Sequence, residues 1–270
     1  MEEKSSKKSD LNEIEIDNNI ENENEIETKH EKPLAARLGE GIFCIIYLVY
    51  TTALVFIMKG KYDAGIAKVD DLYLIPEYVD IYRYSFGFML AAILVFGDAF
   101  HLIPRIIVAF RGSMWKQDFF LGLGTFISSI TMTFFYNVLI GMGDTLEYTE
   151  EEYNFGIEQW ILYLTIIRLI IMFMPFNGWY KSEPNHRMAV LRNIPFVFIG
   201  VLTVFGFLTI SGHASNYPSS FYMIIVLMVI LSFVFYLPVA LHGKENPKLG
   251  MLMIPKTVCY MIMLSLICFY

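Results

Sequence analysis

The uncharged stretch FYMIIVLMVILSFVFYLPVAL occupies residues 221–241 and decides the class of fold. A helix rises about 1.5 Å per residue, so about 20 apolar residues cross the hydrocarbon core of a bilayer. This stretch is therefore long and apolar enough to form one membrane-spanning helix. Six other stretches share its character, and together the predicted spans are 41–58, 84–103 (with 110 as an alternative end), 119–140, 159–176, 194–212, 221–241 and 249–270.

The overall composition agrees with this interpretation. Of the 270 residues, 56% are hydrophobic and 17% are charged, whereas ordinary soluble domains carry about 25% charged residues. The composition excludes a soluble enzyme and a basic nucleic-acid-binding protein, and three cysteines are too few for a disulfide scaffold. We predict an all-α polytopic membrane protein, a seven-transmembrane-helix bundle whose partner is the lipid bilayer.

The first 33 residues have a different composition from the rest of the chain. Residues 1–33 carry 11 acidic and 5 basic side chains, a net charge of −6, whereas residues 34–270 carry 16 and 15. A segment with so few apolar residues cannot bury enough surface to offset its chain entropy. We therefore predict a disordered acidic cytoplasmic tail at 1–33, followed by a transmembrane domain at 34–270.

Basic residues in the short connections predict the orientation, because cytoplasmic loops are enriched in Lys and Arg. The connection at 141–158 has five acidic residues at 144–152 and no basic residue. The connection at 59–83 is mixed, and we expect it either to lie along the outer surface or to be unstructured. Bases gather in the connections after spans two, four and six: Arg111, Lys116, Lys181, Arg187, Arg192, Lys244 and Lys248. We predict the N-terminus inside and the C-terminus outside the cell membrane.

The second span contains a polar stripe. Asp98, His101 and Arg105 follow one another at i, i+3 and i+7, which places them within about 60° of one helix face at 100° per residue. Charged groups at bilayer depth are costly and usually face the bundle interior. Pro104 removes a backbone donor, so we also expect a kink near the end of this span.

Two further bases lie within predicted spans. Arg168 is at the middle of span four, and Lys256 lies seven residues into span seven, about 10 Å deep. We expect Asp98 to pair with Arg168, either as a structural ion pair or as part of a binding or proton-transfer site. The bases outnumber Asp98, which favours a small anionic ligand such as a phosphate or carboxylate headgroup; alternatively, Arg105 and Lys256 extend to the inner headgroups.

The sequence thus predicts a ligand-binding site of Asp98, His101, Arg105, Arg168 and Lys256. We expect the protein to bind or transport a small anionic or lipid-headgroup ligand rather than to catalyse a reaction. The motifs indicate no particular cofactor. Several other polar residues in spans are predicted to form hydrogen bonds between helices, or alternatively to line the same cavity: Ser128, Ser129, Thr131, Thr133, Tyr136, Asn137 and Tyr260.

Three resemblances give alternatives. Asp98 and His101 in a seven-span chain resemble the alkaline ceramidase and progestin/adiponectin receptor superfamily, which implies a zinc-dependent hydrolase. Span seven, however, lacks the H-x-x-x-H of that superfamily, and a metal site of Asp98, His101, His186 and His242 matches no ligand motif. Lys256 in span seven resembles the microbial rhodopsins, and the inside N-terminus resembles the heliorhodopsins, which implies a retinal photoreceptor.

The third resemblance covers most of residues 40–270. GDAFHLIPR at 97–105, with GMLMIPKT at 250–257, is similar to a family of bacterial seven-helix membrane proteins. This resemblance implies the fold and a membrane location, and it brings no activity with it.

Overall fold

The computed structural model describes residues 34–67, 75–147, 155–180, 185–242 and 247–270. Within these ranges the chain is helical, with seven α-helices and two short 3₁₀ helices. The described part from Gly41 to Tyr270 is one compact unit, and the first turns of α2, up to Glu40, belong to a separate one. The elements are α2 (Leu34–Ile66), α3 (Ile75–Arg111), α4 (Gln117–Leu146), α5 (Phe155–Phe173), η1 (Pro175–Asn177), α6 (His186–His213), α7 (Ser219–His242), η2 (Pro247–Leu252) and α8 (Met253–Phe269).

Seven helices of the described chain are long and apolar enough to cross a membrane, which agrees with the predicted number of spans. Two of them are much longer than predicted. Lys59–Ile66 continue α2, and α3 begins at Ile75, so the predicted 59–83 connection was wrong for most of its length. The apolar stretches that predicted the spans end at charged residues such as Lys59 and Arg83, whereas a helix continues as long as its backbone hydrogen bonds do. The predicted tail at 1–33 lies outside the described residues.

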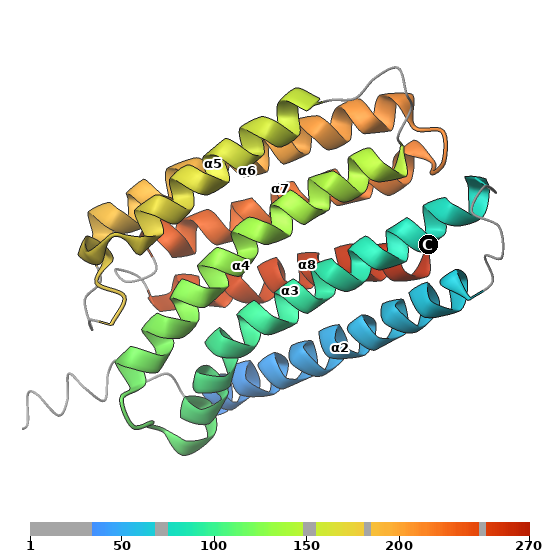
Figure 1. The fold of residues 1–270 in the computed structure, drawn as a ribbon. Coiled ribbons are helices and arrows are strands. Elements are labelled where there is room, and N and C mark those ends of the chain that lie inside the picture. The colour runs from blue at the N-terminus through green and yellow to red at the C-terminus, as the bar shows by residue number, and fades with distance from the viewer. Residues whose placement is uncertain (1–33, 68–74, 148–154, 181–184, 243–246) are drawn as a thin grey trace, which may run out of the picture. The chain divides into compact units, whose positions relative to one another are not determined.

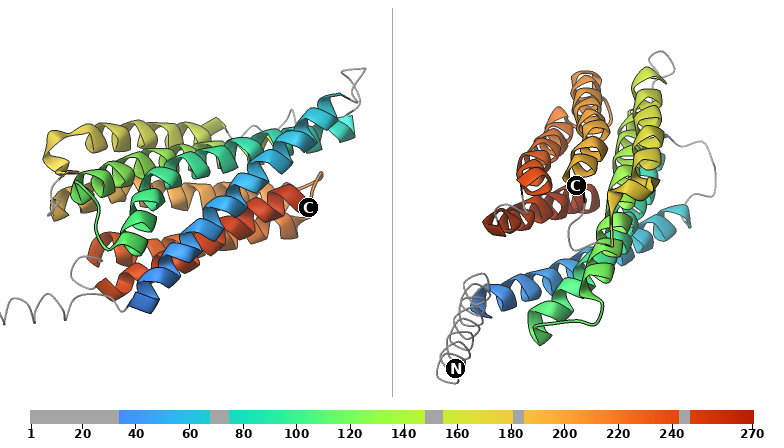
Figure 2. Two further views of the ribbon diagram at one scale, coloured as in Figure 1. Left: turned by 90° about the horizontal axis from the view of Figure 1, so that it is seen from below. Right: turned by 90° about the vertical axis from the view of Figure 1, so that its left-hand side faces the viewer.

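The helices of the compact unit pack in a definite order. The most extensive contact is between α3 and α4, which lie side by side in Figures 1 and 2. Next, α4 contacts α5 and α6, α6 contacts α5 and α7, and α8 contacts both α7 and α3. The core therefore lies among α3, α4, α6, α7 and α8, with fully buried side chains such as Phe135 and Phe207, and α2 adds Tyr47, Leu54 and Met58.

Glycine allows α3 and α4 to approach closely beside the polar stripe. A Cβ atom at Gly124 of α4 would lie 2.3 Å from the carbonyl oxygen of Phe100 and 2.8 Å from the Cα atom of His101. Both atoms belong to the α3 backbone and cannot rotate away. This close approach fixes α4 against the part of α3 that carries Asp98 and His101.

The outer surfaces of the helices are apolar. Large side chains such as Phe56 on α2 and Phe173 on α5 are 72% and 67% exposed. In water, an apolar surface of this extent would be unfavourable, whereas hydrocarbon tails solvate it. The exposed surface thus supports a lipid environment for the seven helices.

Glu147, at the end of α4, fixes the connection between α6 and α7. Its carboxylate accepts hydrogen bonds from the backbone N–H groups of Ser215 (2.7 Å), Asn216 (3.1 Å) and Tyr217 (3.1 Å), and from the Tyr222 hydroxyl (2.7 Å). Burial alone would raise the pKa of Glu147, but these hydrogen bonds outweigh burial and hold the pKa below its ordinary value. The carboxylate is therefore satisfied as an anion.

Candidate functional site

All five side chains of the predicted site line one cavity of about 120 Å³. Asp98, His101 and Arg105 come from α3, Arg168 from α5 and Lys256 from α8. The spacing i, i+3, i+7 brings the three α3 residues to the same face, as helical periodicity requires. Because α3 continues through Pro104 to Arg111, Arg105 remains on this helix and faces the cavity with the other two.

The expected pair of Asp98 and Arg168 was wrong. The Tyr47 hydroxyl on α2 donates to Asp98 Oδ2 at 2.5 Å, and the Ser128 hydroxyl on α4 donates to Asp98 Oδ1 at 3.3 Å. Over the described ranges, Asp98 forms no ion pair with Arg168. The expected partner was a charged group, whereas two neutral hydroxyl groups on the helices adjacent to α3 bind this carboxylate.

Arg168 is the most deeply buried base of the cavity. Its side chain is 1% exposed, and its guanidinium carbon lies 3.6 Å from the centre of the Phe196 ring. The Nε and Nη1 atoms are buried and have no hydrogen-bond partner in the described ranges. A buried donor without an acceptor costs about 1–3 kcal/mol, and more when it is charged. The ring compensates for part of this cost through its cation–π attraction, but the two N–H groups keep their capacity to bind an acceptor.

Lys256 and Arg105 complete the basic lining. The Nζ atom of Lys256 lies 4.6 Å from the centre of the Tyr236 ring and 5.7 Å from that of Tyr260. Among the residues whose placement is described, neither Lys256 nor Arg105 forms an ion pair. Three bases against one carboxylate leave the cavity with a net formal charge of +2, His101 being counted as neutral.

The neutral hydroxyl groups around the cavity are already committed as donors. Thr125 donates to the Leu121 carbonyl oxygen (2.8 Å), and Thr257 donates to that of Met253 (2.8 Å). The Tyr236 hydroxyl donates to Asn193 Oδ1 at 2.9 Å. The uncommitted donors of the cavity are therefore its charged groups, together with His101, whose Nδ1 is buried without a partner. A lining of this kind favours an anion over a neutral polar molecule.

Most of the remaining polar residues take one or both of the roles considered for them, and two do not. Tyr136 on α4 hydrogen-bonds to Tyr260 on α8 (3.1 Å) and to Ser232 on α7 (3.2 Å), and the Asn137 amide donates to Thr165 on α5 (2.8 Å). These contacts confirm the prediction of hydrogen bonds between helices for Tyr136, Asn137 and Tyr260, whereas Thr131 and Thr133 donate to carbonyl oxygens of their own helix, α4. The residues that line the cavity are Ser128, Ser129 and Tyr260.

Sequence reasoning missed Tyr47, the residue with the shortest hydrogen bond to the site. Tyr47 and Thr51 lie at i and i+4 on α2, and they are 1% and 0% exposed. Two polar residues at helical spacing within an apolar span indicate an inward face. That signal was present in the sequence, although it does not say which helix the face meets.

The geometry gives little support to the metal and retinal alternatives. Within the described ranges, no group of three or more His, Cys, Asp or Glu side chains is placed to hold a metal ion. His186 and His242 are exposed and do not line the cavity. Sites for drug-sized organic ligands have volumes of about 300 Å³ or more, so the cavity beside Lys256 is too small for a retinal chromophore.

Comparison with known proteins gives no relative: no protein-family model, curated protein or solved structure matches the chain.

Proposed function

We propose that this multi-pass membrane protein binds, and carries across the bilayer, a small anion bearing a phosphate group, either a free phosphate compound or a lipid headgroup. The observation that carries this proposal is the state of Arg168. Its guanidinium group is buried at the cavity, two of its nitrogen atoms have no partner, and two further bases line the same space. A bound oxyanion would satisfy these donors.

Charge and size both suit a phosphate group. A net formal charge of +2 is complementary to a dianion, and Arg binds phosphate oxygens through two parallel N–H groups. A cavity of about 150 Å³ accommodates benzene, with six heavy atoms. The cavity here, about 120 Å³, suits the five heavy atoms of a phosphate group.

Each residue has a role in this proposal. Arg168, Arg105 and Lys256 bind the anion. Asp98 reduces the positive charge and, through Tyr47 and Ser128, positions α3 against α2 and α4. His101 offers an uncommitted ring nitrogen to the same space.

The proposal includes the orientation predicted from the basic connections, with the N-terminus cytoplasmic. Arg105 lies six residues from the end of α3 at Arg111, about 9 Å along the helix. In this orientation the cavity occupies the cytoplasmic half of the membrane, and the ligand enters from that side.

Native mass spectrometry of the protein purified in mild detergent tests the proposal. We expect wild type to retain a phosphate-bearing lipid or metabolite, and Lys256→Ala to lose it. Lys59→Ala is the matched control, because Lys59 is a half-exposed base outside the cavity, paired with Asp63 at 2.6 Å. The mass of the retained ligand identifies its source.

Other masses would contradict the proposal. Bound zinc would support the metal-dependent hydrolase, and a covalent adduct on Lys256 would support the photoreceptor. Protein without ligand in all three samples would indicate that the charges of the cavity have a structural role alone.

A further inference from the structure

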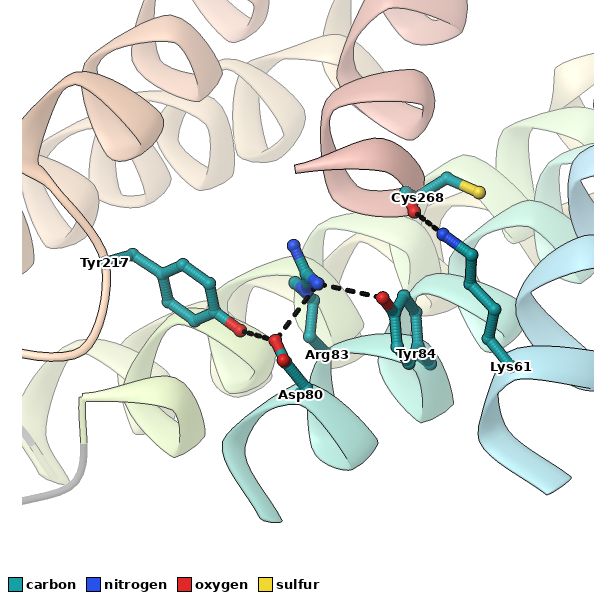
Figure 3. Close-up of polar contacts among 6 residues, drawn as sticks. All are labelled: Lys61, Asp80, Arg83, Tyr84, Tyr217 and Cys268. Atoms are coloured by element: carbon teal, nitrogen blue, oxygen red, sulfur yellow. Dashed lines mark hydrogen bonds and ion pairs between the residues drawn. The ribbon is translucent and has the colours of Figure 1, made fainter. Parts of the chain in front are cut away.

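A second polar cluster lies at the other end of α3 from the cavity (Figure 3). Arg83 on α3 donates to Asp80 Oδ1 at 3.0 Å and to the Tyr84 hydroxyl at 3.1 Å. The Tyr217 hydroxyl, from the connection between α6 and α7, donates to the same Asp80 oxygen at 2.6 Å. Lys61 on α2 lies 5.0 Å from the centre of the Tyr84 ring. Three segments of the chain therefore meet here.

Arg83 has the features that distinguish Arg168. Its side chain is 3% exposed, and its guanidinium carbon lies 4.8 Å and 5.2 Å from the ring centres of Tyr84 and Tyr217. Its contacts with Asp80 and Tyr84 both use Nη2, whereas Nε and Nη1 are buried and have no partner among the residues that the structure describes. Like Arg168, Arg83 is a buried guanidinium group with unused donors.

Within the described part of the chain, Asp80 is the one carboxylate in contact with Arg83, and it is loosely held. Its side chain is 55% exposed, and a single carboxylate oxygen, Oδ1, accepts hydrogen bonds from both Arg83 and Tyr217. Such a carboxylate can turn out to solvent at little cost. Lys61 adds a second base, whose Nζ donates to the Cys268 carbonyl oxygen at 2.6 Å. Two bases and one displaceable carboxylate form a site that an oxyanion can enter in place of Asp80.

The two clusters lie on the same face of α3. Asp80 and Asp98 are 18 residues apart, as are Arg83 and His101, and 18 residues make five complete turns. Arg83 and Arg105 are separated by about 33 Å along the helix, which matches the hydrocarbon core of about 30 Å. Between them, Leu90, Ala91 and Leu94 are no more than 1% exposed, so packed side chains separate the two ends.

From this arrangement we infer that Arg83 and Lys61 form a second binding station for the same phosphate-bearing anion, occupied by Asp80 when the anion is absent. This inference rests on the proposed function. Because packed side chains close the path between the two stations, the anion occupies them in turn, as in a carrier rather than an open channel. Displacement of Asp80 would also release Tyr217 and loosen the connection between α6 and α7 at that end.

Equilibrium binding of radiolabelled inorganic phosphate to the full-length protein in phospholipid-free detergent tests the inference. We expect two phosphates per chain in wild type and one in Arg83→Gln. Arg168→Met should retain the phosphate of the second station. Should Arg83→Gln fail to fold, Lys61→Gln provides the same test. In this variant we expect phosphate to bind the second station at least tenfold more weakly than in wild type. Lys59→Gln, a base on the same helix outside the cluster, is the matched control and should bind as wild type does.

Asp80→Asn separates a binding role from a structural one. If Asp80 occupies the station, its neutralisation should tighten phosphate binding at that station by about tenfold, whereas a structural ion pair predicts no gain in affinity. Displacement of the label by glycerol phosphate would assign a soluble source of the ligand, and displacement by short-chain phosphatidylglycerol would assign a lipid headgroup; both support the inference.

The contrary outcomes are distinct. A single phosphate per chain, lost in Arg168→Met and unaffected by Arg83→Gln, Lys61→Gln and Asp80→Asn, would overturn the second station and leave the proposed function standing. No phosphate bound to wild type would overturn both.

Discussion

Glu147 and Arg168 are charged side chains of the same bundle in opposite states. Glu147 receives hydrogen bonds from three successive backbone N–H groups and a tyrosine hydroxyl. Arg168 is almost completely buried, and two of its nitrogen atoms have no partner. The comparison indicates that a charge whose hydrogen bonds are complete stabilises the fold, whereas a charge left incomplete is available to a ligand. Arg83 is intermediate, since one of its nitrogens is partnered and two are not.

The largest expected effect, on phosphate binding, follows from removing the guanidinium group of Arg168, whose hydrogen bonds are incomplete. Arg168→Met should weaken phosphate binding at the cavity at least about 100-fold, because each hydrogen bond to a charged group contributes about 1.5–3 kcal/mol. Its thermal stability without ligand should be unchanged or higher, since an apolar side chain replaces an unpaired buried cation. Calorimetric titration with phosphate and thermal unfolding in detergent measure the two properties. A large loss of stability would show that Arg168 is structural.

Removing the carboxylate of Glu147, whose hydrogen bonds are complete, should lower stability and leave phosphate binding unchanged. Glu147→Ala leaves the N–H groups of 215–217 without their acceptor, and we expect a loss of about 1–3 kcal/mol in unfolding free energy. Phosphate affinity at the cavity should remain within twofold of wild type, because Glu147 does not line it. Denaturant unfolding and the same titration provide the test. Weakened binding at the cavity would contradict the separation of the two regions.

A smaller effect distinguishes the two partners considered for Asp98. In a double-mutant cycle, Tyr47→Phe and Asp98→Asn should couple by about 1 kcal/mol or more, because their side chains share a hydrogen bond. The cycle of Asp98→Asn with Arg168→Met should show less than about 0.5 kcal/mol, as expected without direct contact. Thermal unfolding of the single and double variants gives both values. Strong coupling between Asp98→Asn and Arg168→Met would instead support an ion pair between these two residues.

The smallest expected effect is a dependence of stability on pH. Hydrogen bonds hold the pKa of Glu147 in the folded protein below its ordinary value of 4.5. The unfolded chain therefore binds this proton first, so the contribution of Glu147 to stability is complete above 4.5 and is lost as the pH falls below it. The unfolding midpoint, followed from about pH 6 down to about pH 3, should fall less in Glu147→Gln than in wild type. Equal slopes would exclude Glu147 as a contributor.

The α3 stripe shows how much of the site the sequence predicts. Helical periodicity placed Asp98, His101 and Arg105 on one face, and all three line the cavity. Their burial follows from the cost of charge in a bilayer. The partner of Asp98 did not follow, because periodicity gives the face of a helix and not the helix that faces it. Tyr47 is 51 residues from Asp98 in the sequence, and tertiary packing alone brings them together.

The fold shows the same limit. Hydropathy predicted seven helices but ended each where its apolar stretch ends. It therefore missed the last turns of α2 and the first turns of α3. Those turns carry Lys61 and Arg83 into the second cluster. Prediction from apolar length alone therefore excluded the part of the chain on which the second station depends.

The most direct test of the central claim is a crystal structure of the protein grown with arsenate, a phosphate analogue whose anomalous scattering locates it. We expect an anomalous peak in the cavity, with arsenate oxygens about 2.7–3.2 Å from Nε and Nη1 of Arg168 and close to Lys256. Absence of a peak there, with both nitrogens bonded to protein oxygens or water instead, would contradict the claim that Arg168 is held unpaired to bind an anion.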